Sequence, residues 1–176
     1  PGANLDLEIQ STSGGVATGT VLASASLAPF GGVNPTVTFD VSGAGLAVNA
    51  GIVLAFVLRS NASLGNDYLL RIISGNRYAP GQCTDSGGGI APGAGWDTIF
   101  KTRVEPATLP GGPGTSDQLN NPAPTNNFTA IFSGFTAAQT FTVGAGGTLT
   151  HIDVMLDPRG GPLLDVQLEV QATTGG

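Results

Sequence analysis

Charged side chains are scarce in this chain, and so are the residues from which many functional sites are built. Charged residues make up 10% of the 176 residues, against about 25% in an ordinary globular protein. The single histidine and single cysteine exclude a zinc site built from several such ligands and exclude an internal disulfide. The net charge is −6 and no run of lysine or arginine occurs, so we expect no binding to nucleic acid.

Long apolar runs and catalytic motifs are also missing. The longest apolar run spans residues 51–58, whereas a membrane helix needs about 18 residues or more, so we expect no membrane span. The sequence contains neither the spacing of acidic residues of an EF-hand loop nor a phosphate-binding loop. We therefore expect no enzyme activity and no cofactor. A calcium site between Asp85 and Asp97, and a hydrolytic pair of carboxylates, are weaker alternatives.

Glycine, small polar residues and apolar residues are what the chain does contain. With 28 glycines and 40% hydrophobic residues, it can build a core, unlike a disordered chain. This composition is typical of secreted all-β proteins, and we expect an extracellular or cell-surface location. The sequence starts at Pro1, without an initiator methionine or a signal peptide, which indicates a processed protein or a segment of a longer one.

Apolar and polar residues alternate over several short stretches, a pattern that predicts half-buried strands. Leu5, Leu7 and Ile9 alternate with polar residues. Residues 51–58 are apolar on both faces, which predicts a central strand. Other strands are expected at 18–27, 36–41, 67–74, 98–104, 127–132, 139–143, 148–156 and 166–171. Because no helical period is convincing, the sequence predicts an all-β fold, a jelly-roll-like antiparallel β-sandwich.

Two stretches do not have the composition of strands. Residues 80–97 are rich in glycine and predict a long surface loop. Residues 105–125 hold five prolines and three glycines, which predicts a semi-extended linker. We therefore divide the chain into a main sandwich body at 1–104, a linker at 105–125 and C-terminal strands at 126–176.

The chain ends much as it begins. Residues 1–15 read PGANLDLEIQSTSGG and residues 162–176 read PLLDVQLEVQATTGG, so the two segments align without a gap from Pro1 and Pro162 onward. Seven of the fifteen pairs are identical: Pro1/Pro162, Leu7/Leu168, Glu8/Glu169, Gln10/Gln171, Thr12/Thr173, Gly14/Gly175 and Gly15/Gly176. Self-similarity at a fixed offset indicates a repeat. The two segments are therefore expected to belong to the same position in two copies of one domain.

A set of loose motifs accompanies this repeat. Residues 139–143 (QTFTV), 146–150 (GGTLT), 152–154 (IDV) and 164–170 (LDVQLEV) resemble the opening of a family of bacterial extracellular jelly-roll-like β-sandwich domains, which occur in tandem on secreted and surface proteins. The later motifs of that family resemble residues 19–26, 37–42, 50–60, 74–79 and 97–104. Here these later motifs precede the opening. The resemblance covers most of the chain and implies anchoring, adhesion or carbohydrate binding, without a catalytic signature.

Three arrangements would accommodate this order of motifs: a circular permutant, a slice of a tandem array, or a subunit whose C-terminal strands complete a neighbouring copy. The third gives a head-to-tail contact that does not close, and such contacts build filaments. The donor strands would bury Phe141, Val143, Leu149, Ile152, Val154, Val166, Leu168 and Val170. On the acceptor side, the strand that carries Leu5, Leu7 and Ile9 holds the equivalent position.

A few other residues are candidates for sites. Trp96, with Tyr68 and Tyr78, is a candidate for stacking on a sugar ring. Candidate glycosylation sites are Asn61 and Asn127, each the first residue of an Asn-X-Ser/Thr triplet. Cys83 is expected to be a buried or idle thiol, with a disulfide to another chain as the alternative, and His151 is expected to be a solvent-facing strand residue.

These observations together predict a structural protein. We expect a subunit or repeat of an extracellular filament or surface array, whose partners are copies of itself joined head-to-tail by strand sharing. A carbohydrate-binding or adhesive module, with glycans as partners, is the alternative.

Overall fold

The computed structural model describes residues 3–30, 36–86, 95–106, 114–121 and 127–160, and these fold into two antiparallel β-sheets. The first sheet runs in the spatial order β2 (Val16–Leu27), β1 (Leu5–Ser13), β5 (Val53–Ser60), β12 (Ala137–Thr142) and β7 (Cys83–Asp85). The second runs in the order β10 (Thr115–Asn120), β9 (Phe100–Glu105), β13 (Gly147–Pro158), β6 (Tyr68–Ser74) and β11 (Phe128–Ile131). Short strands extend it: β3 (Thr36–Asp40) and β4 (Ala47–Val48) pair with β13, and β8 (Trp96–Thr98) pairs with β6.

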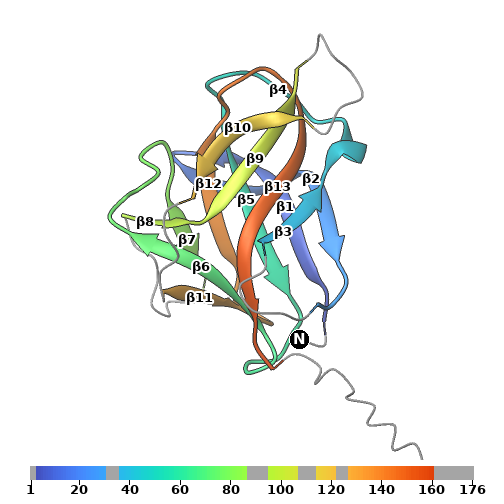
Figure 1. Ribbon diagram of the computed structural model, residues 1–176, viewed down its shortest axis with the longest axis vertical. Helices are drawn as coiled ribbons and strands as arrows, with labels where there is room; N and C mark the ends of the chain where they lie inside the picture. Colours follow the sequence, from blue (N-terminus) through green and yellow to red (C-terminus); the bar gives the residue numbers. More distant parts are fainter. Residues whose placement is uncertain (1–2, 31–35, 87–94, 107–113, 122–126, 161–176) are drawn as a thin grey trace, which may run out of the picture.

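The two sheets face each other and form a sandwich (Figure 1). The only helical segment among the described residues is a single 3-10 turn, Ser42–Ala44. The all-β antiparallel sandwich predicted from the sequence is therefore confirmed. Within the described residues, no helix is long and apolar enough to cross a membrane.

The core lies between the sheets and is filled by the side chains that point inward at alternate positions along the strands. At its centre the Phe56 ring lies 5.6 Å from Phe100 and 6.4 Å from Phe141, measured between ring centroids. Tyr78 meets Phe100 edge-on at 5.0 Å. Since Phe56 and Phe141 come from the first sheet and Phe100 from the second, these rings join the two sheets.

The most apolar segment of the sequence forms the middle of the first sheet, as predicted. β5 is hydrogen-bonded to β1 on one edge and to β12 on the other. Leu54, Phe56 and Leu58 face the core, and the intervening Ala55 and Val57 on the other face are buried as well. β13 is the equivalent strand of the second sheet and pairs along its length with β3, β4, β6 and β9.

The expected linker at 105–125 contains a strand, which corrects the prediction for that part. β10 pairs antiparallel with β9. The Asp117 carboxylate of β10 accepts hydrogen bonds from the backbone N–H groups of Gly144 and Ala145, at 2.8–3.1 Å. Asn120 donates its amide to the carbonyl of Thr98. These bonds hold residues 115–120 against the sandwich although their composition is that of a turn. The loop expected at 80–97 likewise contains β7 and the start of β8.

Candidate assembly site

Strand β1 occupies the position between β2 and β5, which we name the β1 slot. Its backbone pairs with Val16 to Leu27 on one edge and with Leu54 to Ser60 on the other. Leu5, Leu7 and Ile9 have no exposed surface, and they point into the core as the alternation predicts. Burial of each such side chain contributes about 1.5–3 kcal/mol. The slot is therefore a large apolar site that any strand filling it must match.

The outward residues of β1 make specific polar contacts with the slot. Glu8 Oε2 lies 3.1 Å from Arg59 Nε of β5, and the Gln10 amide donates to the same carboxylate oxygen at 2.6 Å. Gln10 Oε1 accepts from the backbone N–H of Gly19 at 2.8 Å. The Thr12 hydroxyl donates to the carbonyl of Val53 at 2.8 Å. Both neighbouring strands thus contact the polar side chains of β1.

The turn that leaves the slot needs glycine. Ser13 pairs with Val16, so Gly14 and Gly15 form a two-residue hairpin turn. Their φ angles are 58° and 79°, in the left-handed region that side chains disfavour. Two positive φ angles in sequence are typical of the turn that matches the twist of paired strands.

The residues that make these contacts are the ones repeated at the end of the sequence. The inward Leu7 recurs as Leu168, and the polar residues at positions 8, 10 and 12 recur as Glu169, Gln171 and Thr173. Both turn glycines recur as well. Among the positions without identity, the inward Leu5 and Ile9 become valine. Residues 162–176 therefore carry the side chains that the β1 slot contacts.

The end of β13 lies beside the start of β1. After β13, Arg159 forms a double hydrogen bond with the buried Asp67 carboxylate, both at 2.7 Å. The residue after Asp67, Tyr68, donates its hydroxyl to the carbonyl of Ala3 at 2.6 Å. Figure 1 shows β13 ending at the same end of the sandwich at which β1 begins. Gly160, the last described residue, therefore lies next to the entrance of the β1 slot.

Five of the residues expected in the donor strands lie in the core of this same chain. Phe141, Val143, Leu149, Ile152 and Val154 are at most 1% exposed and belong to β12, β13 and the turn between them. Within one chain, β12 and β13 therefore fill their own sandwich, as in the permutant arrangement. The other three, Val166, Leu168 and Val170, lie outside the described residues.

Two of the three aromatic residues proposed as sugar contacts are buried, which corrects that expectation. Tyr68 is 0% exposed and packs against Phe30, while Tyr78 is 6% exposed and packs on Phe100. Burial raises the pKa of both hydroxyls. A sugar ring cannot reach either face. Trp96 at the start of β8 keeps partial exposure and is the one of the three with an accessible side chain.

The two glycosylation candidates lie at the surface, and the thiol is buried as predicted. Asn61 and Asn127 are both exposed. Cys83 is 1% exposed, as expected for a buried thiol. Burial and the nearby charges of Asp97 and Asp85 raise the pKa of Cys83 far above its ordinary value. Burial therefore keeps this thiol in its protonated form and away from solvent.

His151 is less exposed than predicted. It lies on β13, its side chain is 21% exposed, and Nε2 is 3.8 Å from an Asp40 carboxylate oxygen. Hydrogen bonds from Ser42 lower the pKa of Asp40, and the nearby His151 lowers it further. This pair joins β13 to β3 at the surface.

The two aspartates considered for calcium lie in different settings. Asp97 is fully buried and accepts from the Tyr78 backbone N–H at 2.8 Å and from the Gln139 amide at 3.3 Å. Burial raises its pKa. Asp85 accepts from the Thr129 hydroxyl at 3.3 Å. Among the described residues, no group of three or more His, Cys, Asp or Glu could hold a metal ion.

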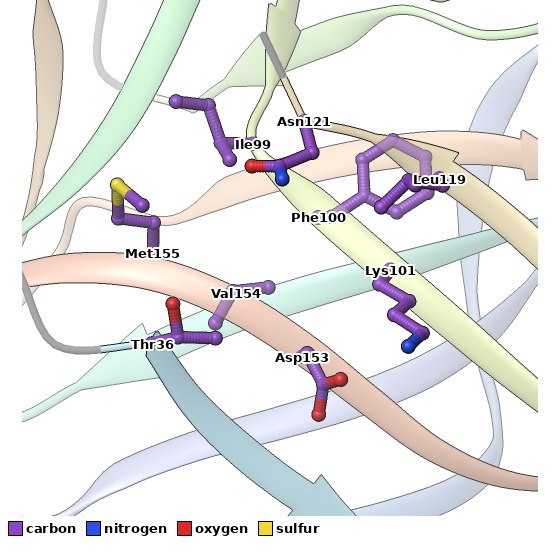
Figure 2. Close-up of a pocket in the computed structure, with 9 residues that line it drawn as sticks. All are labelled: Thr36, Ile99, Phe100, Lys101, Leu119, Asn121, Asp153, Val154 and Met155. Carbon is purple, nitrogen blue, oxygen red and sulfur yellow. The ribbon is translucent and has the colours of Figure 1, made fainter. Parts of the chain in front are cut away.

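A small hollow lies over β9 and β13, bordered by β3 and β10. Met155 and Ile99 lie at one end of it, and Lys101 and Asp153 at the other (Figure 2). The Asp153 carboxylate is already bonded to Thr38 and Arg103, at 2.7 and 2.8 Å. The hollow measures about 120 Å³, less than the roughly 300–1,000 Å³ of ordinary ligand pockets. It is therefore too small for a sugar or a cofactor.

A scan against protein-family models finds no match, and searches of the curated proteins and of the solved structures find none. The class defined by the structure is an antiparallel β-sandwich. The resemblance to the bacterial extracellular domains remains a prediction from the sequence.

Proposed function

We propose that this protein is a structural subunit or repeat of an extracellular filament or surface array, joined head-to-tail through a shared strand. The observation that carries the proposal is the concentration of repeated residues at the contacts of the β1 slot. Glu8, Gln10 and Thr12 each bond to the slot, and each recurs at its aligned position in the second segment. The described residues form one β1 slot, and the sequence holds two segments with the side chains that this slot contacts in β1.

The count of slots and strands favours a tandem array over a polymer of separate subunits. A strand entering from a neighbouring chain must displace residues 1–15, which already make the contacts of the slot. The exchange therefore gains few contacts, and the entropy lost on association opposes it. In a covalent array each copy of the strand fills one slot. Residues 162–176 then form the first strand of the following copy, and the low charge and the exposed Asn61 and Asn127 suit an extracellular setting.

A plug-and-socket experiment tests the shared strand. A chain of residues 16–161 lacks both copies of the strand and is the socket, while the full chain offers residues 162–176 as the plug. When the two are refolded together, we expect a 1:1 complex by size-exclusion chromatography with light scattering. The variant Leu168→Asp in the full chain is the control, and it should abolish the complex because it places a charge in the core.

A socket that stays unfolded beside the wild-type full chain would overturn the proposal. A complex that survives Leu168→Asp would also overturn it, because the contact would then not use the repeated strand. A synthetic peptide of residues 162–176 offered to the socket gives the same test without the rest of the partner chain.

The alternative function, glycan binding, has one observation in its favour. A hollow of about 310 Å³ lies on the first sheet, and Gln10, Arg59 and Asp85 are among the residues that line it. Its volume lies at the lower end of the roughly 300–1,000 Å³ of ordinary ligand pockets. Retention on a glycan matrix that is lost with Arg59→Ala and kept with Trp96→Ala would support a site in this hollow, and no retention of the wild-type chain would remove this candidate.

A further inference from the structure

The segment that resembles strand β1, residues 162–176, belongs to the same chain as the β1 slot. We propose that residues 162–176 can fill the slot of their own chain in place of residues 1–15, so that the sandwich has two interchangeable first strands. This inference rests on the equivalence of the two segments used for the proposed function. It adds that the exchange occurs within one molecule, without a neighbour.

The first argument is the distance that the chain must span. Gly160 is held next to the slot entrance, because Arg159 is bonded to Asp67 and Tyr68 to Ala3. Five residues separate Gly160 from Val166, which is equivalent to Leu5 at the start of β1. Such a connection reaches up to about 20 Å. It therefore suffices to bring residues 162–176 into the slot that begins beside it.

The second argument is the register that the contacts would impose. In the gap-free alignment of the two segments, Leu168 corresponds to the buried Leu7 and Glu169 corresponds to Glu8, the partner of Arg59. Gln171 corresponds to Gln10, whose Oε1 accepts from the N–H of Gly19, so in the proposed arrangement Gln171 would accept that bond. A slip by one residue would turn the apolar side chains to the outer face. The register is therefore fixed by the same residues that fix β1.

The third argument is the ending of the segment. Gly175 and Gly176 replace the two turn glycines, so residue 176 would end where Val16 begins β2. In the proposed arrangement, a chain of residues 16–176 would hold one copy of each strand of the sandwich, with its ends at the β1–β2 turn. A chain of residues 1–161 also holds one copy of each strand, with its ends at the β13–β1 junction.

The two strands differ in how well they fill the core. Leu5 and Ile9 correspond to Val166 and Val170, which are smaller, so the slot prefers residues 1–15 when both are present. Replacement of a buried residue by a smaller one leaves space in the core. We expect the chain of residues 16–176 to melt about 3–10 °C below the chain of residues 1–161.

The test is the folding of the chain of residues 16–176. We expect a monomer with the β circular dichroism of the full chain and a cooperative melt. Leu168→Asp should unfold this chain, whereas the same substitution in the full chain should leave the melting temperature unchanged. Comparing Leu168→Asp in these two chains tests whether residues 162–176 are needed for folding only when residues 1–15 are absent.

Two other results would overturn the inference. If residues 16–176 fold only as concentration-dependent oligomers, the strand is exchanged between chains, which leaves the proposed function standing and removes the exchange within one chain. If they stay unfolded at every concentration, while the peptide of residues 162–176 also fails to bind the socket, then the equivalence of the segments is wrong and both proposals fall.

Discussion

Strands β1 and β13 have similar positions in the fold, but they differ in how often their sequence occurs in the chain. Each lies inside its sheet and is paired on both edges, and each places fully buried residues in the core, such as Leu7 in β1 and Ile152 in β13. β13 occurs once in the chain, whereas β1 has a second copy at residues 162–176. Under the proposal that residues 162–176 can fill the β1 slot, the comparison teaches that burial alone does not make a strand irreplaceable.

The largest expected effect is in β13, which has no substitute. Ile152 is fully buried, so Ile152→Ala should lower the free energy of unfolding by about 2–5 kcal/mol through lost burial and the cavity that remains. The loss should be the same in chains of residues 1–161 and 1–176, measured by urea denaturation. A clearly smaller loss in the longer chain would mean that residues 162–176 support β13 as well.

In β1 the effect should depend on the length of the chain. Leu7→Ala should cost about 2–5 kcal/mol in residues 1–161. In the chain of residues 1–176 the second strand can then fill the slot. The loss should therefore not exceed the difference in free energy of unfolding between the sandwich filled by residues 1–15 and the sandwich filled by residues 162–176, about 1–3 kcal/mol. Equal losses in the two chains would show that β1 is as irreplaceable as β13.

The contact between the end of β13 and the loop before β6 should have a moderate effect. Arg159→Ala leaves the buried Asp67 carboxylate without its double hydrogen bond. Because the Arg159 side chain is 40% exposed and partly screened by solvent, we expect a loss of about 1–3 kcal/mol, less than for a fully buried pair. Arg159→Lys keeps the charge without the paired geometry, so it should recover part of the loss in the same denaturation experiment.

The smallest expected effect is on the outer face of β1. Arg59→Ala removes the ion pair with Glu8, whose side chains are 45% and 23% exposed. An exposed pair of this kind contributes about 0.2–1 kcal/mol. The loss should shrink at about 1 M salt, where charges are screened, and Arg59→Lys should show little loss. A loss that does not depend on salt would indicate packing of the Arg59 chain rather than its charge.

The sequence predicts local features of this fold well and non-local ones poorly. The alternation at Leu5, Leu7 and Ile9 identifies β1 and its inward face because the pattern lies within a few residues. β10 was missed because its strand conformation depends on bonds such as those of Asp117 with the turn at Gly144, far away in the sequence. For the same reason, alternation could not show that β12 and β13 pack in their own chain.

The candidate site was predicted only in part. The repeat located the strand, and the apolar positions followed from alternation. Arg59 and Asp67 were missed, since nothing in their local sequence marks them as partners of Glu8 and Arg159. A signal for Arg59 did exist: identity at the outward positions 8, 10 and 12 is unexpected for solvent-facing residues and indicates specific contacts. Tyr68 and Tyr78 were misjudged because an aromatic side chain suits a core as well as a sugar site.

Amide hydrogen exchange of the full chain with Leu7→Asp tests the central claim most directly. In the wild-type chain, residues 5–13 should be protected and residues 166–174 should exchange fast, because the better-fitting strand fills the slot. With Leu7→Asp the protection should move to residues 166–174, and the rest of the sandwich should stay protected. Loss of protection throughout the sandwich, with residues 166–174 still exchanging fast, would contradict the account, because the second strand would then not fit the β1 slot.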